Sequence, residues 1–172
     1  QDYKLIRRSS GIMYCYFCLA YIEMMKEDQE EAMQYLQLAM DSGRIMDQNY
    51  FRHGISLHES YKMQHESFKR FRDAANFSKK QNDKEVTSFL LDKASQLAFL
   101  LGYPEKACAL LIENAEVLFA MDDPEGAKEV LDSGREELPG EYAKELVPLA
   151  EKIEAVLEES SSPVIEKKKE KV

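Results

Sequence analysis

The chain has 172 residues, of which 44% are hydrophobic and 32% charged, and it contains 7 Gly, 5 Pro and no Trp. A chain of this length and apolar content can bury a core of its own without a disulfide or metal staple. The low Gly and Pro content excludes collagen and low-complexity sequence for most of the chain. The formal net charge of −9 disfavours binding to nucleic acid or to an anionic membrane.

The charge is distributed unevenly along the chain. Residues 1–83 carry 12 basic and 12 acidic side chains, whereas residues 84–172 carry 11 basic and 20 acidic ones. The first half also holds 12 of the 17 Phe and Tyr residues. This asymmetry predicts two surfaces with different functions. The alternative is that it arose by evolutionary drift and has no functional meaning.

No segment has the pattern of a membrane anchor or a signal peptide. The longest apolar run, 13–22, is shorter than the roughly 20 residues that span a bilayer, and it lacks a cleavage pattern. Three cysteines, an odd number, favour a reducing compartment, so we expect a cytoplasmic protein. Because the chain begins at Gln1 rather than Met, we expect it to be a piece of a longer protein.

Apolar residues recur at helical spacing nearly everywhere, and no stretch alternates as a half-buried strand does. One stripe comprises Met33, Leu36, Ala39 and Met40. A second stripe comprises Leu90, Ala94, Leu97 and Leu101. The sequence therefore predicts an all-α fold.

Start and stop signals divide the chain into about eight helices. Asp28 and Asn82 each stand three residues before a Glu, as in a capping box. Later junctions carry Gly or Pro, namely Gly102 with Pro104, Asp123 with Pro124, and Pro139 with Gly140. The predicted helices span 11–26, 28–42, 48–64, 66–81, 83–101, 104–121, 124–138 and 141–158. Residues 3–8 form a ninth helix or extend the first one. Pro148 kinks the last of them or starts a new one.

The predicted helices form a repeating arrangement. Helices of this length with short connections lie antiparallel to their neighbours. Every second predicted start recurs after roughly 35 to 41 residues, and a helix–turn–helix unit of that size is typical of an α-solenoid. Such an open stack leaves a concave side free for binding.

Small residues within this arrangement follow a recurrent spacing. Ala20, Ala32 and Ala39 lie 12 and then 7 residues apart, with Leu36 between the last two. A second set comprises Ala115, Ala127, Leu131, Gly134 and Pro139, and a third comprises Ser95, Ala107, Leu111 and Asn114. Over residues 10–158 this pattern resembles the tetratricopeptide repeat, without that family's Trp, and other α-helical hairpin repeats stay open.

The resemblance implies antiparallel helical hairpins stacked as a right-handed superhelix within residues 1–158. It also implies a non-enzymatic scaffold or adaptor that docks a peptide or helix of a partner protein in its concave groove. On that expectation, polar and aromatic residues on the first helix of each pair bind the partner. They are Tyr14, Tyr21, Asn49, Arg52, His53 and Lys62. Residues 159–172 have clustered charge and few apolar side chains, which predicts a disordered tail.

Residue types that often carry chemistry are interpreted as structural in this sequence. Cys15 and Cys18 form a CxxC pair, but apolar neighbours on both sides favour core packing over redox chemistry. The gap from this pair to His53 and His58 is too long for a zinc finger. The sequence has no phosphate-binding loop and no nucleophile motif. We therefore expect no catalytic residue, no metal, no cofactor and no enzymatic activity.

The stretch 62–80 is locally basic and also carries three Phe residues. Helical spacing places Phe68, Phe71 and Ala75 on one face, which predicts a core face backed by a solvated basic face. If that basic face has a function, we expect it to bind an acidic protein. The alternative function is a sensing repeat domain that binds a ligand or peptide and controls a fused output domain. Homo-oligomer formation also stays open.

Overall fold

The structure is a computed structural model that describes residues 2–44 and 61–161, with side chains described for 11–44 and 64–160. Within these ranges the regular elements are helical and none is a strand. They are α1 (Asp2–Met25), α2 (Gln29–Gly43), α4 (Tyr61–Lys80), α5 (Lys84–Leu100), α6 (Pro104–Phe119), α7 (Pro124–Glu137), α8 (Gly140–Ala143), the 3₁₀ turn η1 (Lys144–Leu146) and α9 (Val147–Ser161). The predicted all-α class is confirmed for the described residues.

Four of the connections between helices share one turn geometry. One residue of each turn has a left-handed backbone, and these residues are Glu27, Asn82, Gly102 and Asp122, with φ between 60° and 69°. The amide of the next residue donates to a carbonyl five residues earlier, for example from Asp28 to Glu23 at 3.1 Å. This hydrogen bond satisfies a free carbonyl at the end of the preceding helix.

Aspartate begins three of the helices. The carboxylate of Asp28 accepts from the amide of Glu31 at 3.1 Å, and the carboxylate of Asp123 does the same from Gly126 at 2.9 Å. Before α5 the cap is Asp83 and not the predicted Asn82, so that prediction was one residue early. Asn82 takes the left-handed position of the turn, which its short polar side chain tolerates.

One predicted helix boundary is wrong, and one that the sequence left open is resolved. α1 begins at Asp2, so residues 3–8 extend the first predicted helix, and α4 runs without a break from Tyr61 to Lys80. The predicted join between residues 64 and 66 is therefore absent, since no Gly or Pro stands there to end a helix. Pro148 lies in the first turn of α9, where its missing amide proton costs little, so it starts a new helix.

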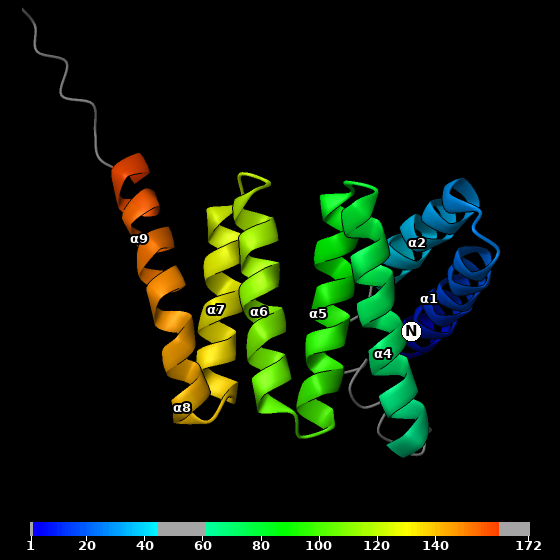
Figure 1. Cartoon of the computed structure of the whole chain (residues 1–172), viewed down its shortest axis with the longest axis horizontal. Coiled ribbons are helices and arrows are strands. Elements are labelled where there is room, and N and C mark those ends of the chain that lie inside the picture. Colours follow the sequence, from blue (N-terminus) through cyan, green and yellow to red (C-terminus); the bar gives the residue numbers. More distant parts are fainter. Residues whose placement is uncertain (1, 45–60, 162–172) are drawn as a thin grey trace, which may run out of the picture.

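Helices adjacent in the chain pack against each other, and Figure 1 shows α4 to α9 side by side in chain order, with α1 and α2 beside α4 and α5. The small residues that the sequence pattern singled out lie in the contacts between helices. Those with no exposed surface are Ala20, Ala32, Ala39, Ala107, Ala115 and Ala127. The right-handed superhelix and the tetratricopeptide register stay predictions.

Gly134 shows how closely the helices approach. A Cβ atom at this position of α7 would lie 2.6 Å from Cδ1 of Leu111 and 3.1 Å from Cδ1 of Leu146, and both leucines are buried. These distances are shorter than an ordinary contact between carbon atoms. A larger residue at this position of α7 would therefore force the side chain of Leu111 or Leu146 to shift.

α1 is apolar on two faces. Its buried face includes Phe17, whose ring stacks on Phe71 of α4 with centroids 4.1 Å apart. Its other face exposes Ile12, Leu19 and Ile22 by 39% to 48%. This double face explains the long apolar run, and no helix in the described ranges combines the length and apolar content needed to cross a bilayer.

The prediction that Cys15 fills the core is wrong. Cys15 is exposed and Cys18 is half-buried. The buried face of α1 is occupied by Met13, Phe17 and Ala20, and Cys15 lies on the opposite side of the helix.

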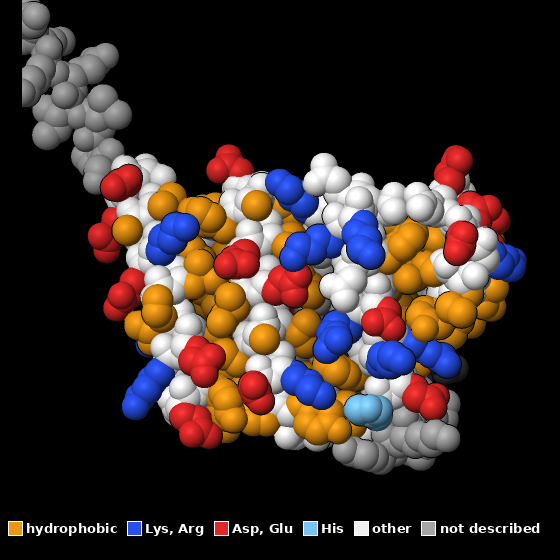
Figure 2. All heavy atoms as spheres, in the orientation of Figure 1, with side chains coloured by type: hydrophobic (Ala, Val, Ile, Leu, Met, Phe, Trp, Pro, Cys, Tyr) orange, Lys and Arg blue, Asp and Glu red, His pale blue; other side chains and the backbone are white. Residues whose placement is uncertain are grey.

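Charged side chains separate by sign over the face in Figure 2. Lys and Arg gather over α4 and α5, whereas Asp and Glu are more frequent over α6 to α9. The basic stretch is therefore a solvated face of α4, where Lys69, Arg72 and Lys80 are exposed, and Phe68, Phe71 and Ala75 are buried as predicted.

Candidate functional site

A groove of about 630 Å³ lies between α2, α5, α6 and α7. We name it the α5 groove, because α5 contributes residues to it from Glu85 at one end to Phe99 at the other. Apolar side chains from three helices form part of its lining, among them Phe89, Phe99, Leu118 and Val130. Its lining residues span more than 90 positions of the chain, from Met40 to Glu137, so the groove exists only in the folded protein.

The remaining lining is rich in carboxylates. Five carboxylates, Glu85, Asp92, Asp123, Glu129 and Glu137, stand against a single guanidinium, that of Arg44. The guanidinium of Arg44 already donates to the Glu85 carboxylate at 3.0 Å. A concave surface lined by charges of one sign concentrates the opposite charge near it. The α5 groove therefore attracts cations.

One face of α5 supplies a row of polar side chains to the groove. Ser88, Asp92 and Gln96 follow one another at intervals of four residues and so lie on the same face of the helix. The hydroxyl of Ser88 donates to Oδ1 of Asn114 on α6 at 2.7 Å. Oδ2 of Asp92 accepts from Nε2 of Gln96 at 2.8 Å and from Nζ of Lys93 at 3.0 Å. Asp92 is therefore held in place from two sides.

Gln96 keeps one polar atom without a partner. The side chain is 2% exposed and lines the groove. An ionised carboxylate only accepts, so the amide nitrogen of Gln96 must face Asp92 and the amide oxygen must point elsewhere. Among the described residues, this Oε1 is the buried side-chain atom found without a hydrogen bond. A buried acceptor left without a donor costs about 1–3 kcal/mol.

The structure places the predicted partner-binding residues elsewhere or leaves them undescribed. Tyr14 and Tyr21 are half-buried on α1 and contact α4, and neither lines the α5 groove. The hydroxyl of Tyr14 lies 2.7 Å from that of Ser67, and the guanidinium of Arg70 lies 5.4 Å from the Tyr21 ring centre. Asn49, Arg52, His53 and His58 lie outside the described residues, as does the predicted tail from residue 162 onward. Lys62 is in α4, but its side chain is not described.

Asp92 and Gln96 were not among the predicted site residues. An acid and an amide four residues apart are typical of an exposed helix face, and nothing in their spacing signals burial. One signal was available, because α5 carries Ser, Thr and Gln between its apolar positions where a surface helix normally carries Lys and Glu. Such a helix is buried on nearly all sides, and its short polar groups must then find partners within the protein.

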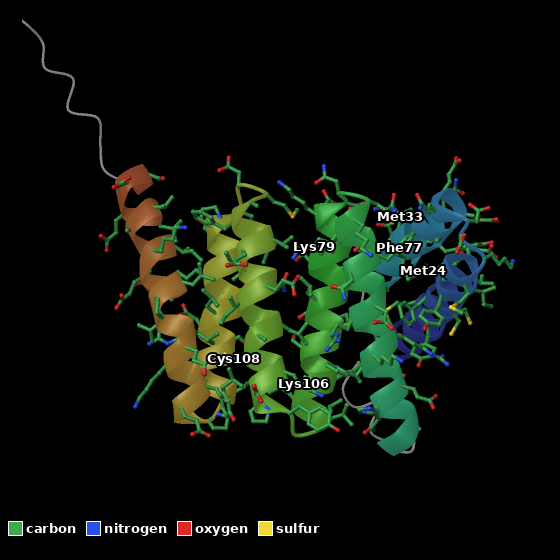
Figure 3. All side chains as sticks on the ribbon, in the orientation of Figure 1. Met24, Met33, Phe77, Lys79, Lys106 and Cys108 are labelled. Atoms are coloured by element: carbon green, nitrogen blue, oxygen red, sulfur yellow. The ribbon has the colours of Figure 1, made fainter. Side chains whose placement is uncertain are left out.

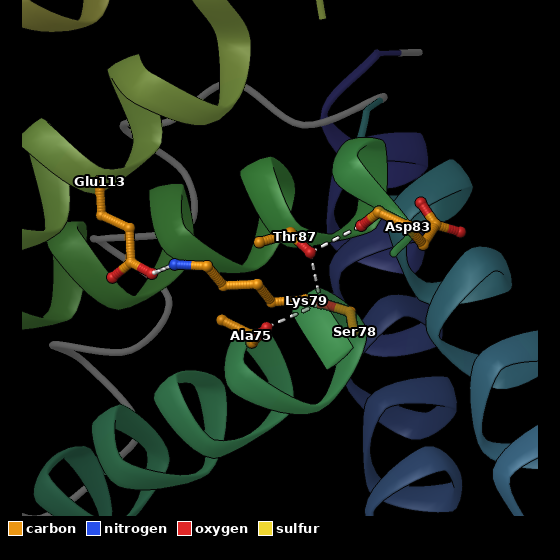
Figure 4. Close-up of polar contacts among 6 residues, drawn as sticks. All are labelled: Ala75, Ser78, Lys79, Asp83, Thr87 and Glu113. Atoms are coloured by element: carbon orange, nitrogen blue, oxygen red, sulfur yellow. Dashed lines mark hydrogen bonds and ion pairs between the residues drawn. The ribbon is translucent and has the colours of Figure 1, made fainter. Parts of the chain in front are cut away.

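Polar clusters outside the groove are structural. Figure 4 shows Ser78, Thr87 and Asp83 linking the ends of α4 and α5, with Lys79 reaching across to Glu113 of α6 at 2.6 Å. Another group, Glu23, Asp28 and Glu31, could hold a metal by its oxygen positions. Two of its members are already engaged, because Glu23 pairs with Lys26 at 2.7 Å and Asp28 caps α2.

Cys108 on α6 is also structural (Figure 3). Its thiol is buried and lies 3.5 Å from the carbonyl oxygen of Tyr142 and 3.9 Å from the Glu145 carboxylate. Burial, followed by the nearby Glu145 charge, raises the pKa of the Cys108 thiol above its usual value. A thiol that stays protonated is a poor nucleophile.

Comparison of the chain with protein families, with curated proteins and with solved structures finds no match. The resemblance to tetratricopeptide repeats stays a prediction. Within the described residues, the fold and the site define an all-helical chain with a partly apolar, acidic groove.

Proposed function

We propose that this chain is a non-enzymatic scaffold or adaptor that docks a peptide or helix of a partner protein in the α5 groove. The observation that carries the proposal is the groove's lining, which combines Phe89, Phe99 and Leu118 with carboxylates at its polar positions. An amphipathic segment fits such a surface, with its apolar side chains on the aromatic residues and its polar side chains on the walls. Apolar contacts would supply affinity, and the polar groups would set orientation.

The arrangement of the helices supports the same proposal. Neighbouring helices pack through small buried residues, and the α5 groove lies open between α2, α5, α6 and α7. In our proposal these helices form a right-handed, tetratricopeptide-like array of hairpins, and the α5 groove is its concave side. A stack of this kind presents a continuous surface to an extended partner.

The proposal places the partner among proteins rather than nucleic acids. The net charge of −9 and the carboxylates of the groove would repel a phosphate backbone. A cytoplasmic location belongs to the same proposal, and the odd cysteine count supports it.

A display selection with a blocked groove tests this function. Random 15-residue peptides are selected on the full chain, and their affinities are measured on two tryptophan variants. Ser133 is exposed on α7 and lines the groove, so Ser133→Trp fills the site. Ala155 is exposed on α9 and lies outside the lining of the groove, so Ala155→Trp is the matched control.

We expect the selected peptides to bind Ala155→Trp like the parent chain and to bind Ser133→Trp about tenfold more weakly or worse. Peptides that bind both variants equally would contradict docking in the α5 groove. A selection that enriches no peptide would also contradict the proposed function.

A further inference from the structure

The α5 groove contains two acceptor groups that are close together and incompletely used. Both hydrogen bonds that hold Asp92 fall on Oδ2, from Gln96 and Lys93. Asp92 itself is 29% exposed along its side chain, so it faces the groove as well as its two donors. Beside it, the Oε1 atom of Gln96 is buried and has no donor within the part of the chain that the structure describes.

The groove has a surplus of negative charge around this pair. Even with Lys93 counted beside Arg44, five carboxylates face two cations, and both cations are already in ion pairs. A ligand with a neutral N–H donor would satisfy the Gln96 oxygen but would not neutralise the surplus negative charge of the groove. A ligand that brings a cationic donor would satisfy both.

We propose that the segment docked in the α5 groove is basic, and that one of its Arg or Lys side chains binds against Asp92 and the amide oxygen of Gln96. This inference rests on the proposed function and names the chemistry of the partner. Arg and Lys side chains present five and three N–H donors respectively, and they accept no hydrogen bonds. A charged donor on a carboxylate also makes a stronger hydrogen bond than a neutral one.

The surroundings of the pair suit the stem of such a side chain. Phe89 and Phe99 line the groove on either side of Asp92 along α5. Aromatic faces bind cations directly and also cover the methylene stem of Lys or Arg. The basic side chain would therefore reach the two acceptors with its stem against one of these rings.

A fragment titration tests the pair directly, without any knowledge of the partner. The probe is N-acetyl-argininamide, and its neutral analogue N-acetyl-citrullinamide is the control. Backbone and side-chain amide resonances of the full chain are followed by NMR at low salt. We expect the arginine probe to shift the resonances of Ser88, Asp92 and Gln96, including the side-chain NH₂ of Gln96. The citrulline analogue should bind about fivefold more weakly or worse, because it lacks the charge.

Three variants separate the proposed pair from general attraction to an acidic chain. Gln96→Met keeps the shape of the side chain and removes the acceptor, and Glu129→Gln removes one exposed charge from the groove wall. Glu151→Gln removes one exposed charge from α9, away from the groove. Asp92 is left intact, because its carboxylate forms an ion pair with the buried Lys93.

We expect Gln96→Met and Glu129→Gln each to weaken the arginine probe about threefold or more, and Glu151→Gln to leave it unchanged. Equal weakening in all three variants, or shifts spread over every acidic surface, would overturn the inference. So would peptides from the display selection that are blocked by Ser133→Trp but contain no enrichment of Arg or Lys. That last result would leave the proposed docking function intact.

Self-association is the remaining outcome. The basic face of α4 in a second copy also offers cations to an acidic groove. A concentration-dependent shift to dimers in sedimentation experiments, abolished by Ser133→Trp, would overturn the assignment to a partner segment. A monomer at all concentrations, together with arginine binding at Gln96, would support it.

Discussion

Glycine at position 134 has opposite consequences from glycine at position 11. Gly134→Ala places a methyl group 2.6 Å from Leu111, in a contact between buried side chains. Alanine favours a helix by about 1 kcal/mol over glycine, but overpacking a core costs about 1–3 kcal/mol. We expect a net loss of up to about 2 kcal/mol in the free energy of unfolding, measured by urea denaturation.

Gly11→Ala is the matched control for this prediction. Gly11 lies within α1 and is exposed, and a methyl group added there would meet no atom within 4 Å. Helix propensity then acts alone, so we expect a gain of up to about 1 kcal/mol. If both substitutions change stability in the same direction, the close packing of α7 against Leu111 is wrong.

The three cysteines should react with a thiol reagent in the order of their exposure. Cys15 is exposed, Cys18 is half-buried, and Cys108 is buried with a raised pKa. In a DTNB assay at pH 8 we expect Cys108 to react at least about a hundredfold more slowly than Cys15. In the double variant Cys15→Ser, Cys18→Ser the fast phase should vanish and the slow phase remain. A fast phase that survives in this variant would contradict the burial of Cys108.

Cys108 should also make stability depend on pH above neutrality. Because its folded pKa is raised, the folded chain keeps this proton at a pH where the unfolded chain, with a thiol pKa near 9.0, has lost it. The stability that the protonated Cys108 thiol contributes is therefore complete below the unfolded pKa. It is lost as the pH rises above that value and through the folded pKa. We expect the stability difference between the parent chain and Cys108→Ala to narrow between pH 8 and pH 10 in urea titrations. A constant difference would contradict the raised pKa.

At the level of the helices, two hydroxyl groups between α4 and α5 make more hydrogen-bond contacts than they have protons to donate. The hydroxyls of Ser78 and Thr87 lie 2.8 Å apart, and both residues are buried. Ser78 also lies 3.0 Å from the Ala75 carbonyl, and Thr87 lies 2.6 Å from the Asp83 carbonyl. Two hydroxyl protons therefore serve three contacts, and the two residues act as one unit.

A double-mutant cycle measures this coupling. We expect Ser78→Ala and Thr87→Val each to lower the free energy of unfolding by about 0.5–1.5 kcal/mol. The double variant should cost less than the sum by about 0.5 kcal/mol or more, because the second change removes a group that the first has left without a partner. Effects that add within error in urea denaturation would show that the two hydroxyls are independent.

The helices themselves were largely predictable, because specific residue types mark where most of them begin and end. Asp28, Gly102, Pro104 and Asp123 have backbone roles that few other residues fill, so the sequence places those turns. The start of α4 carries no such residue, and there the prediction failed. The burial of the small residues was also predictable, since their spacing matches the places where helices cross.

For the whole molecule, protection against hydrogen exchange should vary along the row of helices. α5 buries ten of its side chains, whereas the described part of α9 buries only Ala150 and Ile153. In a row of helices that contact mainly their neighbours, opening begins where burial is least. We expect amides of α5 to exchange at least about a hundredfold more slowly than those of α9, as measured by mass spectrometry. Uniform protection would indicate a single cooperative unit.

The candidate site was not predictable from the sequence, because it depends on which helices share a face. The prediction placed binding on the first helix of each pair, which includes α5 and α7, but it named residues of the first two pairs, such as Tyr14 and Tyr21. The groove is lined by α2, α5, α6 and α7, and its Gln96 is singled out only by a missing hydrogen bond. The spacing of nearby residues predicts neither how the helices pair nor that the Gln96 oxygen lacks a donor. Both depend on contacts between residues that are distant in the chain.

The shared geometry of the turns has a consequence for how such a chain can grow. The caps at Asp83 and Asp123 stand 40 residues apart, and each follows a left-handed residue and closes its turn with a hydrogen bond to the carbonyl five residues earlier. A duplication or deletion of the segment from one cap to the other would join the chain at a turn of the same geometry. Gene rearrangement could thus change the number of hairpins, and with it the length of the molecule, without altering the geometry of any turn.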